Sequence, residues 1–563
     1  MRVNRHLLFS VTFFSCCASL VKAQEPVSSE LSSIHGNFQV DAQYYEPDSL
    51  IGAPKVPEKM LSNVFGNLNY TKGNFSAGVR YEAYNNVRQG FDPRYKGQGI
   101  VNRFARYQTN LLDITVGNIY EQFGNGLMFR TYYEPGLLYD NSLDGIRVIS
   151  NPVKGITLKG LVGKQRYFFS VGPGIVRGVD GEINLNDLFD SVLGDKKTRV
   201  ILGGSFVSKY QPDEDPDLIL PANVATYGGR VNVIREAFNF MAEYAYKIND
   251  PSADNHFSYK PGEALFTSLS YAASGISFLV QAKRIDNMSF RSDRNANLQS
   301  LLINYLPATT KQHTYQMLAL NPYATQLRGE IGLMGEVQFK LKKNTLFGGD
   351  YGTEVTLNYS QASGLHQIPV GDSLTSQYFY RTEYNDMGAL YYQDYFIEIN
   401  KKFSKQWKGT FMYANQFYNR NIIQFTAENA GYANLKTDIV VVDLTYKYAS
   451  SSSIRFESQG LFAASPKMVT NSNLVAKGHW ATLLIEWTPN SNWFFAVYDQ
   501  YNYGNPDPAL KIHYYLGTFG FNKDASRIAL SYGKQSAGIF CVGGVCRTVP
   551  ASNGITLSIT SSF

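Results

Sequence analysis

The chain has 563 residues, of which 40 are tyrosine and 36 are phenylalanine, while charged residues make up only 17% and the net charge is +6. Soluble proteins usually carry about 25% charged residues and helical membrane proteins are markedly apolar, whereas the mean hydropathy here is −0.23. After the first 23 residues, no stretch approaches the roughly 18 uninterrupted apolar residues of a membrane helix, so any membrane-spanning structure must be built from strands.

The N-terminus has the three parts of an export signal. Arg2 and Arg5 form a positively charged start, residues 7–20 are apolar, and Val21-Lys22-Ala23 is a small-residue cleavage site. We therefore predict a signal peptide over residues 1–23. A lipoprotein signal cut before Cys16 or Cys17 is the alternative, although the residues ahead of these cysteines lack the usual leucine.

The mature protein has almost balanced charge. Removal of the signal peptide takes away three basic residues and no acid, which lowers the net charge to about +3. This balance indicates no nucleic-acid partner. We expect residues 24–35 to form a short periplasmic lead.

Apolar residues recur at every second position over most of the remaining chain, which is the period of a strand. This alternation begins at Phe38, and the segments 75–83, 238–246 and 438–448 show it most clearly. The runs are about 9 to 12 residues long, the length that crosses a bilayer at a tilt, whereas sandwich strands typically have about 5 or 6 residues. Aromatic residues also gather near the ends of these runs, as in the girdles of membrane barrels.

Residues 120–147 and 284–294 carry too much charge for a lipid-facing strand, and residues 304–315 continue this polar character. A basic side chain near the bilayer midplane costs on the order of 2–4 kcal/mol, so these charges must face water or one another. We name as candidate lumen or constriction residues Glu121, Arg130, Glu134, Arg147, Arg284, Asp286, Arg291, Asp293 and Arg294.

Two interpretations of these charges compete. In the first, they pair with one another and hold inward-folded segments to the barrel wall. In the second, they line a constriction that selects solutes by opposed acidic and basic surfaces, with three arginines facing three acids: Arg284, Arg291 and Arg294 against Glu121, Glu134 and Asp286. Both interpretations predict segments that fold into the barrel.

Two shorter segments depart from the strand pattern. Apolar residues at helical spacing over 185–193 predict a short amphipathic helix that packs over a barrel rim, inside a loop over 173–198. The acidic run 213–217 is expected to be a solvated loop, with a surface calcium site as the alternative.

Tight polar turns alternate with long segments in the C-terminal half, as in barrels with short periplasmic turns and long outer loops. We expect long loops at 361–387, 418–434, 464–477 and 536–552. Counting the runs predicts about 22 to 26 strands. If residues 286–327 are treated as one long inserted segment, short turns and long loops again alternate in the chain that follows.

Cys541 and Cys546 are the only cysteines left after signal removal, and the Gly543-Gly544 pair between them is a hairpin turn signal. In an exported protein this pattern predicts a disulfide. The last strand ends at Phe563, with apolar residues on one face and Ser and Thr on the other. This ending is similar to the signal that the barrel-assembly machinery recognises in outer-membrane proteins.

The six histidines of the mature chain form no metal-binding spacing, and there is no GxSxG or phosphate-binding glycine loop. We therefore expect no enzyme activity, catalytic residue, cofactor or metal. A hydrolase embedded in a barrel is a distant alternative.

Several segments resemble an uncharacterised family of Bacteroidota outer-membrane proteins, catalogued as a domain of unknown function: 117–130, 140–148, 284–294, 304–326 and 538–563. The resemblance spans essentially the mature chain. It implies an outer-membrane barrel of a Gram-negative bacterium, and it implies no substrate and no catalytic residue.

The sequence thus predicts an all-β, antiparallel outer-membrane barrel over residues 24–563, with long outer loops and inward-folded segments, in contact with membrane lipids and lipopolysaccharide. The predicted function is a porin-like or transport-associated channel for small polar solutes. The alternative is a non-conducting scaffold or a partner of a secretion or surface-lipoprotein complex. Because alternation begins at Phe38, we expect no plug domain before the barrel and no energised uptake of the plugged type.

Overall fold

The computed structural model describes residues 32–297, 299–371, 377–425, 434–464, 478–542 and 545–563. The predicted signal peptide lies outside these residues, as does the predicted lead up to residue 31. The first strand, β1 (Ser33–Tyr45), includes the last three residues of that lead.

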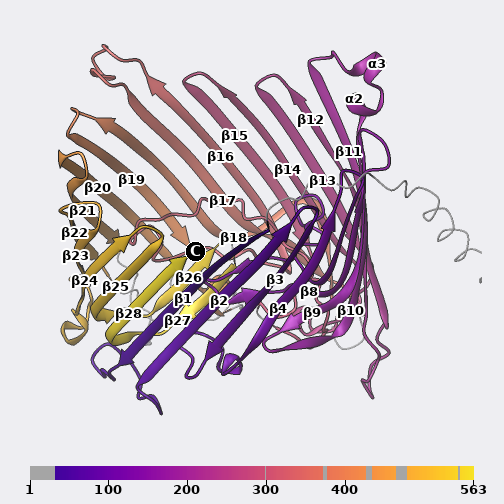
Figure 1. The fold of residues 1–563 in the computed structure, drawn as a ribbon, viewed down its shortest axis with the longest axis horizontal. Helices are drawn as coiled ribbons and strands as arrows, with labels where there is room; N and C mark the ends of the chain where they lie inside the picture. Colours follow the sequence, from indigo (N-terminus) through magenta and orange to yellow (C-terminus); the bar gives the residue numbers. More distant parts are fainter. Residues whose placement is uncertain (1–31, 298, 372–376, 426–433, 465–477, 543–544) are drawn as a thin grey trace, which may run out of the picture.

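The structure is a closed barrel of 24 antiparallel strands, in which each strand pairs with the next and β1 pairs with the last strand, β28 (Figure 1). This number lies within the predicted range. After β1, the wall strands are β2 (Met60–Lys72), β3 (Phe75–Tyr84), β4 (Gly97–Gln108), β5 (Leu112–Ile119), β8 (Leu143–Ser150), β9 (Ile156–Tyr167), β10 (Ser170–Asn184), β11 (Thr198–Tyr210), β12 (Asn223–Arg235), β13 (Phe238–Lys247), β14 (Gly262–Ala273), β15 (Ile276–Asp286), β16 (Gly329–Leu341), β17 (Thr353–Pro369), β18 (Tyr380–Lys402), β19 (Trp407–Tyr418), β20 (Leu435–Ala449), β21 (Ser452–Ala463), β22 (Trp480–Thr488), β23 (Trp493–Tyr501), β24 (His513–Lys523), β25 (Ser526–Gln535) and β28 (Ser552–Ser562).

The outer surface of the wall is apolar. Side chains such as Val79, Leu357 and Val440 are about two-fifths exposed although they lie in the middle of strands, as expected of a surface that contacts lipid. Aromatic pairs such as Trp487 with Phe495, whose ring centres are 5.2 Å apart, form a girdle near one end. The protein is therefore a bacterial outer-membrane β-barrel.

The two ends of the barrel differ in their connections. At the short-turn end, β2 joins β3 and β24 joins β25 through two-residue turns, and this end faces the periplasm in outer-membrane barrels. At the long-loop end, the strands are joined by longer segments such as 46–59 and 248–261. The expected alternation of short and long connections is confirmed.

Two of the predicted loops are wrong in extent. β17 runs to Pro369 and β18 begins at Tyr380, so most of the expected loop 361–387 is a hairpin that continues beyond the membrane, where both faces meet water and the alternation of polarity is lost. Residues 173–184 belong to β10 and not to a loop. Glycines interrupt the apolar pattern in this strand. At Gly178 the reason is close packing, because a Cβ atom on this residue would lie only 2.8 Å from the ring of Phe123.

The helices within the described ranges are few and short. α2 (Leu185–Leu188) and α3 (Asp190–Leu193) confirm helical structure over 185–193 at the short-turn end, but as two separate turns, and Phe189 and Val192 are exposed instead of packing over the rim as predicted. α4 (Arg420–Phe425) follows β19. Single 3-10 turns form η1 (Pro93–Tyr95), η2 (Ala253–Asn255) and η4 (Pro508–Leu510). In the described residues, no helix is long and apolar enough to span a membrane.

Two segments from the long-loop end fold into the barrel. The first, residues 120–142, contains the small hairpin of β6 (Tyr133–Glu134) and β7 (Tyr139–Asp140). The second, residues 287–328, connects β15 to β16 and confirms the long insertion predicted over 286–327. We call them the first and second inner segments.

The inner segments bury two hydrophobic cores inside the barrel. In the first core, residues 123–129 and 288–306 pack against the inner face of β5 and of β8 to β15. In the second core, Met317 and Leu318 pack against strands on the other side, from β18 to β24, and against β1 and β2. The lumen is therefore filled by protein from both sides instead of being open throughout.

The chain end completes the barrel at the short-turn end. The backbone N–H of Phe563 donates to the carbonyl of Gly36 at 2.9 Å, and the N–H of Gly36 donates to the carbonyl of Phe563 at 3.0 Å. The exposed ring of Phe563 crosses Gly36, where a Cβ atom would lie only 2.3 Å from it. The terminal ring thus seals the pairing of β28 with β1.

Replacing Phe563 with Asp is expected to lower the amount of folded protein in the outer membrane while export across the inner membrane continues. The charge would stand at the lipid-facing end of the closing strand pair, where the assembly machinery is expected to read the aromatic residue. The measurement is the heat-dependent shift in electrophoretic mobility of outer-membrane fractions. Undiminished assembly of this variant would contradict the assigned role of the terminus.

The predicted cysteine pair lies in the hairpin of β26 (Gly538–Val542) and β27 (Val545–Val549). The backbone register places Cys541 directly opposite Cys546. The disulfide stays a prediction, which the mass of the linked peptide in non-reduced protein would test.

Candidate functional site

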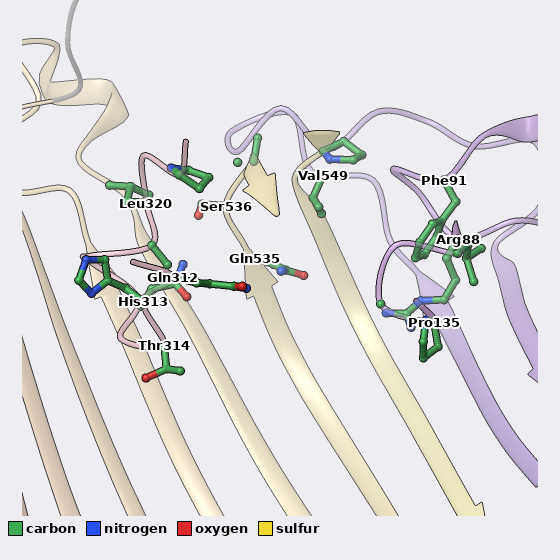
Figure 2. Close-up of a pocket in the computed structure, with 18 of the residues that line it drawn as sticks. Arg88, Phe91, Pro135, Gln312, His313, Thr314, Leu320, Gln535, Ser536 and Val549 are labelled. Carbon is green, nitrogen blue, oxygen red and sulfur yellow. The ribbon is translucent and has the colours of Figure 1, made fainter. Parts of the chain in front are cut away.

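A cavity of about 960 Å³ lies inside the barrel near the long-loop end. The second inner segment forms one side, β1 and β2 form part of the wall, and residues 88–91 and 135–138 stand opposite. Figure 2 shows Gln312 and Thr314 on one side of the cavity and Arg88 on the other. The cavity is therefore the space that the inner segments leave unfilled.

The lining mixes apolar side chains with many uncharged polar groups and a few charges. Side-chain amides come from Gln39, Gln43, Asn63, Gln89, Gln312, Gln316 and Gln535, and aromatic rings come from Phe65, Phe91, Tyr305, Tyr323 and Tyr392. Among the described residues, the buried Oδ1 atom of Asn63 has no hydrogen-bond partner. Amides that offer both donors and acceptors, beside flat rings, suit a small polar solute better than an apolar one.

The second inner segment is anchored to the wall along its length. Lys311 lies 2.6 Å from Glu336 of β16, and the Nε2 atom of His313 lies 2.5 Å from Asp394 of β18. Further on, the hydroxyl of Tyr315 donates to Asp443 of β20 at 3.2 Å. These contacts hold the side of the cavity that the segment forms.

The beginning of the same segment is fixed by buried charges. Arg291 is 2% exposed and binds Asp254, which also accepts a hydrogen bond from Ser289. Arg294 is also buried, and its Nη2 atom donates to the carbonyl groups of Gln211 and Pro221, both at 3.1 Å. Charges buried in this way are stable only while their partners remain in place.

The first inner segment is tied down by a four-membered network of buried charges. Arg166 of β9 binds Glu82 of β3 at 2.6 Å and Asp140 of the inner segment at 2.7 Å. Arg80 of β3 binds the same two acids. Burial opposes ionisation of Asp140, but Arg166 and Arg80 outweigh it, so the pKa of this carboxyl lies below its ordinary value.

Sequence reasoning identified only Asp140 of this network within a polar segment and named none of its members as site residues. Arg80 and Glu82 lie on the polar face of the predicted strand 75–83, and their alternation with apolar residues showed that they point inward. Their partner Arg166 lies 84 residues from Glu82. No local pattern connects residues so far apart.

The predicted site residues are placed in separate clusters. Arg284 and Asp286 lie 3.8 Å apart, and Arg284 also binds Glu263. Glu121 and Arg147 form an ion pair at 3.1 Å.

The remaining predicted residues contact aromatic rings, backbone or amide groups. Arg130 stacks over the rings of Tyr132 and Tyr305, with its guanidinium carbon 4.4 and 4.0 Å from the ring centres. Glu134 accepts from the backbone of Gly136, and Asp293 accepts from Gln211, both at 3.0 Å.

Of the three arginines expected to face three acids across water, only Arg284 lies near one of the named acids, Asp286. Arg284, Arg291 and Arg294 are all buried. This is the arrangement of the first interpretation, in which charges hold inner segments to the wall. The opposed-charge constriction requires exposed side chains at these positions, and the structure does not place them there.

The acidic run 213–217 lies in the loop between β11 and β12. Asp213 accepts from the backbone of Leu220 at 2.9 Å, and Asp215 accepts from the backbone of Asp217 at 2.9 Å, so these carboxylates cap their own loop. Across the described part of the chain, no group of three or more His, Cys, Asp or Glu residues could hold a metal ion.

Comparison with solved structures finds large outer-membrane proteins at low identity. A mutant of the ferric enterobactin receptor PfeA of Pseudomonas aeruginosa matches with a TM-score of 0.41 and 10% identity, over 95% of this chain and 81% of that one. The siderophore receptor PirA of the same organism gives 0.39 and 10%, over 96% and 81%. The outer-membrane protein OpdK, also from P. aeruginosa, gives 0.35 and 9%, over 76% and 97%. No curated protein sequence matches the chain. The model of one family matches residues 4–563, and the chain belongs to this family, the family of unknown function DUF6029.

Proposed function

We propose that the protein is an outer-membrane channel for small polar solutes, in a Gram-negative host for which the sequence resemblance suggests the Bacteroidota. In this proposal, solutes move through the amide-lined cavity, which lies beside the second inner segment. The observation that carries this proposal is the cavity itself, because a segment folded in only to fill the barrel would not leave about 960 Å³ with seven side-chain amides in its lining.

The test is single-channel conductance of the purified protein in a planar bilayer, with variants that narrow the cavity. Asn63→Trp and Gln535→Trp together place two large rings in its lining. We expect open conductance for the natural protein and a fall by about half or more for the variant, because conductance follows the narrowest section of a pore.

The matched control is Val79→Trp with Val440→Trp, which adds the same side chains to the lipid-facing surface. We expect this control to conduct like the natural protein. Heat-dependent mobility confirms that both variants are folded. Equal conductance of the narrowed variant and the control would place the pathway elsewhere, and a natural protein that never conducts would refute the proposal.

A non-conducting scaffold is the second candidate function. It is favoured by the two hydrophobic cores that fill the lumen and by the buried charges of Arg291 and Arg294, which fix the second inner segment. Under this proposal the inner segments stiffen a platform for a secretion or surface-lipoprotein complex. Silence in the bilayer, with normal folding, is the result expected of it.

A further inference from the structure

A second recess, of about 490 Å³, opens at the short-turn end on the inner face of β16 to β20. Lys340 lies opposite Glu354, Glu354 lies opposite Asn400, and Asn400 lies opposite Thr410, so these four form one row across neighbouring strands. Lys340 shares its strand face with Glu336, four residues earlier, which binds the second inner segment. The row therefore faces the lumen.

The recess carries a large excess of positive charge. Its lining includes two acids and five lysines: Lys340, Lys343, Lys401, Lys402 and Lys408. Asp443 is paired with Arg455 at 2.9 Å, whereas Glu354 accepts from the neutral amide of Gln338 at 2.7 Å and keeps its negative charge in the recess. In the part of the chain that the structure describes, none of the five lysines forms an ion pair, whereas Lys311 and Lys283 elsewhere in the lumen do. Lys401 follows the lumen-facing Asn400, so it lies on the other strand face, and its Nζ atom donates to the carbonyl of Phe347 at 3.2 Å.

The turn that borders the recess is fixed by its own hydrogen bonds. The Oγ1 atom of Thr345 donates to the carbonyl of Lys342 at 2.7 Å and accepts from the N–H of Gly348 at 3.1 Å. The Oγ1 atom of Thr353 donates to the carbonyl of Phe347 at 2.8 Å. The turn thus holds its lysines at defined positions beside the strand wall.

Three of these lysines, Lys340, Lys343 and Lys402, come together beside Tyr351 and Gly352. A Cβ atom on Gly352 would lie 3.3 Å from the Cε atom of Lys340 and 3.7 Å from the Cγ atom of Lys343. The Nζ atom of Lys402 lies 4.7 Å from the ring centre of Tyr351, next to Gly352. Like charges brought together in a concave wall repel each other, and the low-dielectric wall strengthens their joint field.

We propose that this recess binds a small anion with several negative charges at the periplasmic mouth of the barrel. Ammonium groups with no carboxylate partner supply the charge. The neutral groups beside them are already engaged, since the hydroxyl of Thr410 donates to Asn400 and the amide of Asn400 donates to Glu398, both at 2.6 Å. This inference goes beyond the proposed channel, because anion binding here does not require that the barrel conducts.

The test is calorimetric titration of the purified full chain in detergent with pyrophosphate, at low and at high salt. In one variant, three lysines of the recess are replaced together: Lys340→Gln, Lys402→Gln and Lys408→Gln. In the matched control, three lysines of the same end that do not line the recess are replaced: Lys342→Gln, Lys405→Gln and Lys523→Gln. Both variants lose the same charge, and heat-dependent mobility confirms that both fold.

We expect pyrophosphate to bind the natural protein and the control alike, to bind the recess variant about tenfold or more weakly, and to bind less tightly at high salt. Citrate in place of pyrophosphate shows whether phosphate or carboxylate groups are preferred, and binding of either supports the proposal. If both variants lose pyrophosphate affinity equally, the binding comes from the overall positive charge of this end of the barrel and not from the recess, which would overturn the proposal. Absence of binding to the natural protein, or binding of an acidic peptide alone, would overturn the proposal.

Discussion

Replacing Arg166 with Met is expected to loosen the first inner segment at the barrel wall. The substitution leaves Glu82 and Asp140 buried with Arg80 as their only basic partner in the network. An uncompensated buried charge costs about 3–5 kcal/mol, which weakens the attachment of a segment that the first hydrophobic core and the Glu121–Arg147 ion pair also hold. Hydrogen exchange or limited proteolysis of residues 120–142 in the folded protein measures the effect.

The matched control is Lys197→Met, which removes an ion pair with Glu236 at 2.6 Å whose side chains are 76% and 60% exposed. Because water solvates both partners, we expect no change in protection of residues 120–142. If the Arg166 variant keeps the protection of the natural protein, the network does not hold the segment in place.

Shortening the second inner segment is expected to give the largest change in conductance. Replacing residues 309–321 with a short Gly-Ser linker removes the anchors at Lys311, His313 and Tyr315 and leaves the first hydrophobic core intact. Barrels of about 16 to 18 strands already hold an aqueous channel, so half of this wider lumen should open and raise the conductance about threefold or more.

A milder variant separates the loss of the segment from the loss of its anchors. Lys311→Gln, His313→Gln and Tyr315→Phe together break three wall contacts and keep the chain in place. We expect a smaller rise with more frequent current fluctuations, recorded in the same bilayer measurement. Unchanged conductance after excision would mean that residues 309–321 do not bound the conducting path.

The barrel itself was predictable because its main signal is local. The alternation over 75–83 and 438–448 places every second side chain on lipid, and the same alternation narrows the strand count to the predicted range that includes 24. The insertion at 286–327 was predictable because it breaks the alternation. The hairpin over 361–387 was not, since outside the membrane a strand has no apolar face to reveal it.

The candidate site was less predictable because it depends on pairing between distant strands. Composition showed that Arg291 must avoid lipid, but its partner Asp254 comes from a loop packed against it only in the folded barrel. The cavity is lined by glutamines from β1, the second inner segment and β25, and none of them stands out among the polar residues of its own strand or loop. The register of the closed sheet, which no short pattern contains, brings them together.

The two hydrophobic cores draw on different parts of the chain, and this sets an order of assembly. The first core draws on nothing beyond Leu327, so it can form once β15 and the second inner segment are in place. The second core joins Met317 and Leu318 to strands as late as β24 and also to β1 and β2. The second core can therefore form only after β1 has paired with β28 and closed the barrel. The amide-lined cavity, which takes walls from both, is therefore the last part of the lumen to acquire its shape.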